Sequence, residues 1–590
     1  MLLLPGHGTT AVPDGDAHTY PAGKGMSVSY ACGYSCPEDY PTEPEFGRFA
    51  YFFPDGDGIP VSADTTRHLD DLADAMVQAP QDEIENSSIP PVFTYFGQFI
   101  DHDITANTDR ETGFSIIDTQ VVTPVARGEV SKKLQNLRAG TLNLDSVHGG
   151  GPVQGPLAKK LDEALRFPAD RSKLWAGKVS PGPIGTVPFP ADPDDEARDL
   201  LRVSRLIEGN GSPLSEADLR ALPDDLRKMF IKEDDSLNLQ RAIIGDMRND
   251  ENLAVAQFHL AVIRLHNRII DHAHEHPDAP NGDADALFNW GRKMTSWHYQ
   301  WLVANAYLPA ICDADTLVDV MEAGPRVYND FLDKNRPSDP SLLPLPLEFS
   351  VAGFRFGHTM VRDAYDWNRF FGRPHGDPVL DQADFPLLFQ FTGNGGMRGA
   401  PSLPDHWPIE WDRFVHPPTA DAPDRSARRI DTNIAIPLGA MVNENPGING
   451  RMAHLASRNL RRGLRLNLPS AQACLQKLRD TYSISLPELS EAQLTSGTTG
   501  DAIRTGNFVE HTPLWFYILK EAEELGKNGQ LGPLGSRIVA DTLMGLIAND
   551  PQSYWNATAR PGDWHPNDGV KPDGVVIDSV AKMMEATRLL

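Results

Sequence analysis

Three ionisable side chains stand together in an apolar segment, and this arrangement constrains the chain more than any other feature of its sequence. Residues 95–105 read Tyr-Phe-Gly-Gln-Phe-Ile-Asp-His-Asp-Ile-Thr, with His102 between Asp101 and Asp103. Burying ionisable groups in such a setting is costly unless they are paired, metal-bound or catalytic. We therefore expect His102 either to be a core histidine satisfied by a neighbouring acid or to belong to a functional site.

Two further segments supply side chains of the same kinds. Residues 354–359, Phe-Arg-Phe-Gly-His-Thr, put His358 in an apolar setting. Arg248 and Glu251 precede a segment in which apolar residues recur every three to four positions, a pattern typical of an amphipathic helix. Taken singly, His358 fits a core histidine, and Arg248 fits a salt bridge at a helix start, which is worth little when exposed. Together with His102 they supply an iron ligand, a base and a cation, which haem chemistry with peroxide requires.

The apolar periodicity predicts a mainly α-helical protein with long structured loops and little β structure. Helices are expected over residues 93–104, 253–274, 287–308, from about 354, and near 452–462, 470–481, 514–525 and 534–548. Loops are expected over the proline- and glycine-rich segments 147–200, 335–347 and 373–425. We predict an N-terminal arm (1–50), one large helical domain (51–550) and a C-terminal extension packed on that domain (551–590).

The composition excludes some classes of partner. Lys and Arg number 54 against 81 Asp and Glu, a formal net charge of −27. Nucleic acids and anionic membrane surfaces need basic patches, so we expect neither as a partner. No apolar run reaches the roughly 18 residues of a transmembrane helix, and residues 1–5 are too short for a signal-peptide core. Cys32 and Cys36 either close a small loop in an oxidising compartment or are unpaired thiols.

Read together and in this order, the three segments resemble the animal-type haem peroxidase superfamily, the relatives of myeloperoxidase and cyclooxygenase. The likeness covers roughly residues 50–550 and is nearest to bacterial peroxidase members. It implies a helical haem-peroxidase domain, with haem b between the helix at 93–105 and the helix at 354–365.

The resemblance also assigns roles to individual residues. His102 matches the distal base, Gln98 a polar residue of the peroxide pocket, and Arg248 the catalytic distal arginine. His358 matches the proximal ligand of the haem iron, and Asn459 the asparagine that hydrogen-bonds this ligand. Residues implied near the haem propionates are Arg355 and Arg462.

Two acids match positions that are covalently bound to haem in mammalian relatives. Asp101 and Glu251 correspond to the carboxylates that form ester bonds to haem methyl groups, so such bonds are an expectation here. Asn252 follows Glu251. The sulfonium link that a methionine makes at this position in myeloperoxidase therefore cannot form.

Asp103 matches a calcium ligand beside the distal histidine. The partner loop is 138–149, which puts Asn143 and Asp145 at two side-chain positions and Thr141 at or near a carbonyl position. Oxygen ligands of this kind suit calcium. Ala139 falls where a threonine is expected, so we expect a weak or partly occupied Ca²⁺ site.

The resemblance implies an enzyme that reduces hydrogen peroxide through a ferryl intermediate and oxidises small organic donors or halides. It also favours a secreted protein with a part in the response to oxidative stress. A fatty-acid oxygenase of the same superfamily is an alternative, but such enzymes carry a tyrosine three residues before the proximal histidine, where this chain has Arg355. A haem-binding or adhesive protein without activity would not need His102, Arg248 and Gln98. A non-haem metal hydrolase built on residues 101–103 lacks a second ligand cluster.

The remaining histidines fit structural roles. His259 and His266 are seven residues apart on the predicted helix 253–274, but no third metal ligand lies near them in the sequence. The aromatic segment 297–301, Trp-His-Tyr-Gln-Trp, is likewise predicted to pack in the core.

Overall fold

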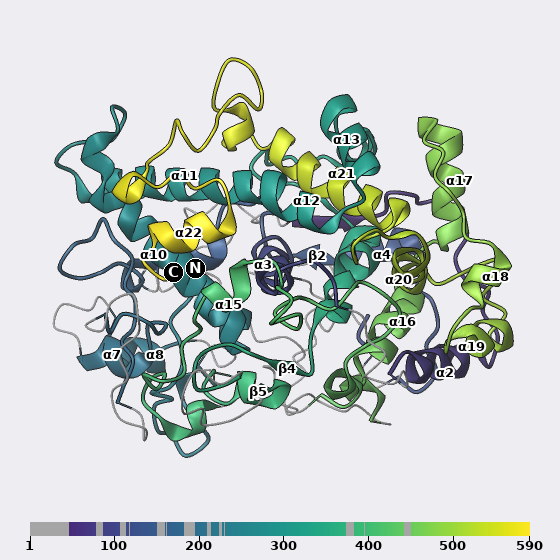
Figure 1. Cartoon of the computed structure of the whole chain (residues 1–590), viewed down its shortest axis with the longest axis horizontal. Helices are drawn as coiled ribbons and strands as arrows, with labels where there is room; N and C mark the ends of the chain where they lie inside the picture. Colours follow the sequence, from purple (N-terminus) through teal and green to yellow (C-terminus); the bar gives the residue numbers. More distant parts are fainter. Residues whose placement is uncertain are drawn as a thin grey trace.

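Amphipathic helices form the framework of the molecule (Figure 1). The computed structural model describes residues 47–77, 86–106, 114–116, 119–149, 160, 162–181, 195–208, 214–222, 227–228, 230–372, 383–393, 396–441 and 450–590. The longer helices are α2 (Thr65–Val77), α3 (Val92–Ile104), α10 (Leu253–Asp271), α11 (Ala284–Leu302), α13 (Ala314–Ala323), α14 (Arg326–Asn335), α16 (Leu455–Arg465), α17 (Ala471–Tyr482), α20 (Leu514–Leu525) and α21 (Pro533–Asn549). The shorter helices are α4 (Arg127–Lys133), α5 (Asp145–His148), α7 (Val203–Glu208), α8 (Glu216–Arg220), α12 (Leu308–Ile311), α15 (Asp412–Val415), α18 (Glu491–Leu494), α19 (Gly500–Thr505) and α22 (Val580–Ala586).

Strands in the described residues are short and lie away from the centre of the fold. β1 (Gly47–Ala50) pairs antiparallel with β2 (Gln135–Asn136) and parallel with β3 (Leu345–Pro346). β4 (Ala364–Tyr365) pairs antiparallel with β5 (Ala383–Asp384). The prediction of a mainly helical fold with little β structure is confirmed.

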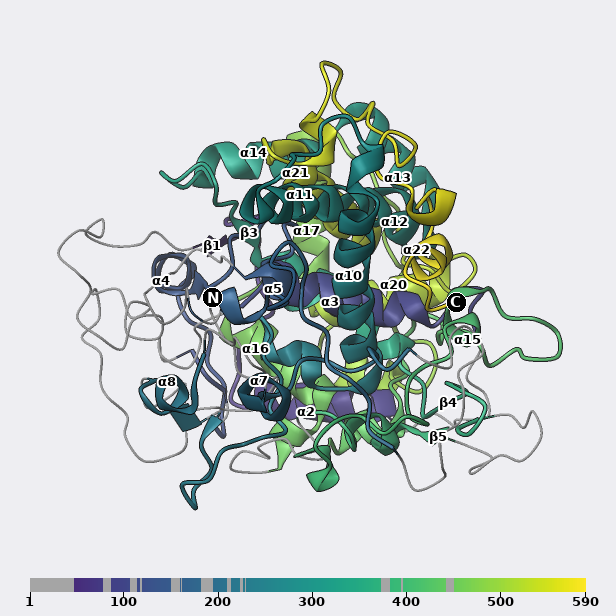
Figure 2. The same ribbon diagram turned by 90° about the vertical axis from the view of Figure 1, so that its left-hand side faces the viewer.

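Helices α3 and α10 cross at the centre of the molecule (Figure 2). Phe96 of α3 stacks on Phe258 of α10 with ring centroids 5.0 Å apart, and Phe99 lies 5.2 Å from the same ring. α11 also packs on α10, and its Tyr299 ring meets Phe96 of α3 at 6.0 Å. These aromatic contacts fix α3, which carries the 97–105 segment, against the start of α10.

The predicted helix positions are mostly confirmed, with differences at two places. The helix expected over 287–308 begins at Ala284, because Asp283 caps it by accepting a hydrogen bond from the Asp285 amide. At Val303 it passes into a π-helical segment (Val303–Tyr307), which continues into α12. The helical run therefore continues past the predicted end at residue 308 to Ile311, with Pro309 inside it. The segment from 354 forms a 3₁₀ helix, η6 (Gly353–Met360), rather than an α-helix.

The end of the chain packs on the central helices. α22 lies against α10, where the Arg264 guanidinium donates to the Thr587 carbonyl at 3.0 Å. The predicted arm over 1–50 lies almost wholly outside the described residues, as do Cys32 and Cys36. Within the described residues, no helix combines the length and the apolar character needed to cross a bilayer.

His298, a buried histidine of α11, makes the free energy of unfolding depend on pH. Both ring nitrogens of His298 lack a hydrogen bond to the described residues, and burial lowers the pKa of His298 to about 3. Between pH 6.5 and 3 the unfolded chain binds a proton here and the folded chain does not, so this site lowers stability as the pH falls below 6.5. The loss is about 1.4 kcal/mol per pH unit. We expect His298→Leu to reduce the fall in unfolding free energy between pH 6.5 and 4.5 by about 2–3 kcal/mol. Parallel curves for variant and wild type, measured by urea unfolding, would contradict this.

Candidate functional site

A cavity of about 630 Å³ lies beside α3, next to the start of α10, η6 and the start of α16. Most of its wall is apolar, with Phe93, Phe354, Phe385 and Phe389 among the lining side chains. The polar and charged residues in the wall come from several separate segments. They include Gln98 and Asp101 of α3, Glu251 and Asn252 before α10, Arg355 and His358 of η6, Arg458 of α16, and Gln390 and Arg398.

His358 enters the cavity wall with one ring nitrogen already engaged. Its Nδ1 lies 2.9 Å from the side-chain amide nitrogen of Asn459 on α16. With that amide turned by 180°, Oδ1 would accept a hydrogen bond from Nδ1–H and leave the lone pair of Nε2 for a ligand in the cavity. Burial lowers the pKa of His358 to about 3, and Arg355 and Arg458 lower it in the same direction. The imidazole is therefore neutral at physiological pH, the form that coordinates a metal. The structure brings the predicted pair His358 and Asn459 together.

Gln98 connects α3 to the start of α10. Its Nε2 donates to Oε1 of Glu251 at 3.1 Å, and its Oε1 accepts from Nδ2 of Asn252 at 3.1 Å. Asn252 also caps α10, because its Oδ1 accepts from the Val255 amide at 3.0 Å. The side chains of Gln98 and Glu251 are thereby held at one wall of the cavity.

Asp101 is the second carboxylate in the wall. Its Oδ1 accepts a hydrogen bond from Thr105 Oγ1 at 2.9 Å. Burial raises the pKa of Asp101, while the positive charges of Arg355 and Arg248 oppose that rise. Both acids predicted to reach haem methyl groups therefore line the same cavity as His358.

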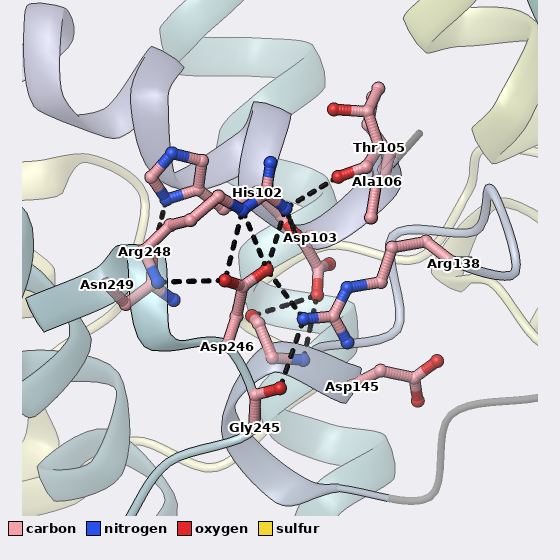
Figure 3. Close-up of polar contacts among 12 residues, drawn as sticks. His102, Asp103, Thr105, Ala106, Arg138, Asp145, Gly245, Asp246, Arg248 and Asn249 are labelled. Carbon is pink, nitrogen blue, oxygen red and sulfur yellow. Dashed lines mark hydrogen bonds and ion pairs between the residues drawn. The ribbon is translucent and has the colours of Figure 1, made fainter. Parts of the chain in front are cut away.

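His102 and Arg248 are buried beside the cavity but do not form part of its wall. Nδ1 of His102 lies 2.8 Å from Oδ1 of Asn249 in η2 (Met247–Asp250) (Figure 3). Arg248 donates to the carbonyl oxygens of His102 and Thr105 at 3.1 and 2.6 Å, and to Asp246 at 2.7 Å. The arginine thus satisfies carbonyl groups at the end of α3, which a helix leaves without partners. This contact fixes the position of His102.

A buried acid holds this arrangement together. Asp246 accepts from Arg248 and, at 2.7 Å, from Arg138 (Figure 3). Burial alone would raise the pKa of Asp246, but the two guanidinium groups outweigh it and hold that pKa below its usual value. Sequence reasoning missed Asp246 and Arg138, although an acid two residues before Arg248 was visible in the sequence.

Comparisons with known proteins relate the chain to haem peroxidases. The chain is 24% identical to a haem peroxidase 2 of Caenorhabditis elegans over 52% of this chain and 40% of that protein. It is 22% identical to myeloperoxidase of Mus musculus over 49% of this chain and 39% of that protein. A family model described as animal haem peroxidase matches residues 211–382, a span that contains Arg248, Glu251, Arg355 and His358.

These matches support a relationship to the animal haem peroxidase superfamily. The chain covers only 32% of a peroxidase-like protein of Margaritifera margaritifera and well under half of the two relatives above. A special closeness to bacterial members stays a prediction.

Among solved structures, a fatty acid alpha-dioxygenase of Oryza sativa matches 92% of this chain and 84% of its own with a TM-score of 0.53 and 13% identity. An Arabidopsis thaliana fatty acid alpha-dioxygenase matches 93% and 77%, with a TM-score of 0.52 and 14% identity. At this identity the two neighbours establish the fold alone.

The cavity residues fit the haem that the superfamily implies. An apolar wall suits a flat hydrophobic ring, and pockets for ligands of moderate size have volumes of roughly 300–1,000 Å³. The neutral imidazole of His358 is fixed by Asn459, as metal-binding histidines usually are. Arg355 and Arg458 add positive charge for the propionates. The cavity wall includes Arg458 and not the predicted Arg462. The two arginines are four residues apart on α16, about one helical turn, so the sequence could have pointed to Arg458 as the alternative.

The acids of the predicted calcium loop make hydrogen bonds within the chain. Asp103 accepts hydrogen bonds from the Leu144 amide and from Ser146 Oγ, at 3.1 and 3.0 Å. Asp145 accepts from Arg292 at 2.8 Å. Burial, and then the charge of Asp145, raise the pKa of Asp103 to about 7. Thr141 and Asn143 lie nearby in the loop, but the described residues hold no cluster of three or more histidine, cysteine or acidic side chains able to bind a metal. Calcium here stays a prediction from the resemblance.

Arg292 supplies a positive charge beside Asp145. Its side chain is 28% exposed and that of Asp145 is 2% exposed. We expect Arg292→Met to lower the free energy of unfolding by about 1–3 kcal/mol, because a buried carboxylate loses its charged donor. Melting temperatures with Ca²⁺ or with a chelator should be equal for the wild type. A wild-type melting temperature that rises with Ca²⁺ would instead favour the calcium prediction.

Proposed function

We propose that this chain is a haem-dependent peroxidase that reduces hydrogen peroxide and oxidises small organic donors or halides. The observation that carries the proposal is the meeting of His358, Asp101 and Glu251 in one apolar cavity. His358 would bind the iron through Nε2, with Nδ1 held by Asn459. Arg355 and Arg458 would neutralise the propionates. Haem, when bound, supplies the electrons that reduce peroxide and then withdraws electrons from the donor.

The chain's own residues divide the remaining work. His102 would accept a proton from peroxide; its buried ring is neutral, and its reach to peroxide from beside the cavity stays a prediction. Arg248 would keep His102 at the end of α3 through the carbonyl contacts described above; a direct contact of Arg248 with peroxide stays a prediction. Gln98 would offer a side-chain amide at the cavity wall. Asp101 and Glu251 would be available to form esters with haem methyl groups. Secretion and a role in the response to oxidative stress stay predictions as well.

Lipid oxygenation is the second candidate, favoured by the apolar cavity wall and by structural neighbours that are fatty acid alpha-dioxygenases. Against it stands Arg355, three residues before His358, where oxygenases of the superfamily carry a tyrosine. Tyr95 and Tyr307 also line the cavity, but neither of them is the residue three positions before His358. Phenol or halide oxidation with peroxide, and no oxygen consumption with a long-chain fatty acid, is therefore the expected pattern.

The test is the Soret spectrum of the haem-loaded protein before and after one equivalent of hydrogen peroxide. We expect a ferric spectrum with histidine ligation and a rapid change with peroxide. The matched variant His358→Ala should lose that ligation, whereas His298→Leu should keep it. A spectrum that does not respond to peroxide would overturn the peroxidase proposal and favour a haem-binding protein. Oxygen uptake with fatty acid would favour the oxygenase.

A further inference from the structure

One asparagine connects His102 to a second buried histidine. Nδ1 of His102 lies 2.8 Å from Oδ1 of Asn249, and Nδ2 of the same amide lies 3.0 Å from Nδ1 of His259 on α10. All three residues are 0% exposed. This row of contacts joins α3, η2 and α10, and the proposed function makes no use of His259.

The two contacts fix where each imidazole carries its proton. Burial lowers the pKa of both His102 and His259 to about 3, so each ring is neutral and has one N–H. The amide oxygen of Asn249 can only accept, which puts the proton of His102 on Nδ1 and the basic lone pair on Nε2. The amide nitrogen can only donate, which makes Nδ1 of His259 the acceptor and leaves its proton on Nε2.

The position of His259 is not explained by packing. Its Nε2 has no hydrogen bond within the described part of the chain, and its ring meets the edge of Phe99 at 6.0 Å. A buried N–H without a partner costs stability, and an apolar side chain would avoid that cost. The contact that an apolar residue could not replace is the one to Asn249.

We propose that His259 is a positioning residue that orients the Asn249 amide and thereby holds His102 in the tautomer whose Nε2 can accept a proton. Without an acceptor at His259, the amide is free to turn by 180° and to donate from Nδ2 to His102. The proton of His102 would then move to Nε2, and the ring could no longer serve as a base there. The link to peroxide rests on the proposed function; the tautomers do not.

Two substitutions of His259 separate positioning from packing. Asparagine puts a side-chain oxygen close to where Nδ1 of histidine lies, so His259→Asn can still accept from Asn249. Leucine fills more of the space but cannot accept. We expect His259→Leu to slow the reaction with peroxide by about 10–100-fold, the usual effect of losing such an outer partner. His259→Asn should keep the rate within about threefold. A purely structural role predicts the opposite order, with leucine the more stable and more active variant.

The second readout is independent of turnover. Nitrogen-15 NMR of histidine-labelled holoprotein, in its diamagnetic ferrous carbonyl form, reports which nitrogen of each ring carries the proton. We expect His102 protonated at Nδ1 in the wild type and in His259→Asn, and at Nε2 in His259→Leu. His102 protonated at Nε2 in the wild type, or unchanged in His259→Leu, would overturn the proposal. If the wild type ignores peroxide but shows these tautomers, the proposed function fails and the positioning role stands.

Discussion

Replacement of His102 by leucine is expected to slow the reaction of the haem-loaded protein with hydrogen peroxide by about 10²–10⁴-fold, the usual contribution of a positioned general base. The ring is neutral and buried, and Asn249 fixes its orientation. Haem should still bind, because His358 and Asn459 lie on other elements. Stopped-flow spectroscopy at the Soret band measures the rate directly.

A matched control separates loss of the base from general damage to the core. His298 is also a buried neutral histidine, but it lies on α11 and its ring packs against Trp564, with no hydrogen bond to Asn249. His298→Leu should therefore react with peroxide at the wild-type rate. If His102→Leu also kept that rate with its haem spectrum intact, His102 would have no part in the chemistry.

The sequence was sufficient to predict the helical framework and five polar residues of the cavity wall, which are Gln98, Asp101, Glu251, Arg355 and His358. The 3.6-residue periodicity of 253–274 predicted α10 closely, because its apolar face is continuous and its start is capped by Asn252. The resemblance to haem peroxidases, and not periodicity, predicted that His358 and Asn459 meet and that Asp101 and Glu251 share a site with them.

The direction in which Arg248 points could not be predicted in that way. A long guanidinium side chain donates hydrogen bonds to the acceptors that lie nearest to it. For Arg248 these are Asp246 and two carbonyl oxygens at the end of α3. The choice between the cavity and these acceptors depends on how η2 packs against α3. The same holds for Arg292, whose pairing with Asp145 joins α11 to a loop far away in the sequence.

The largest effect on stability is expected at Asp246, and Asp246→Asn tests it. The side chain is fully buried between Arg138 and Arg248, which are 1% and 8% exposed. Removing its charge leaves two buried cations without a counter-ion, and breaking a buried pair costs about 3–5 kcal/mol. That is a large part of the roughly 5–15 kcal/mol by which domains are stable.

Because Asp246 also holds Arg248 at the end of α3, the loss should be accompanied by slower reaction with peroxide. The exposed pair of Arg67 and Asp64 provides the control, since Asp64→Asn should leave the denaturation midpoint unchanged. Adding Arg138→Met to Asp246→Asn removes one of the two unpaired cations and should recover part of the lost stability. Urea unfolding of the three variants measures this, and equal midpoints for Asp246→Asn and wild type would mean that water or a neighbouring group compensates the two arginines.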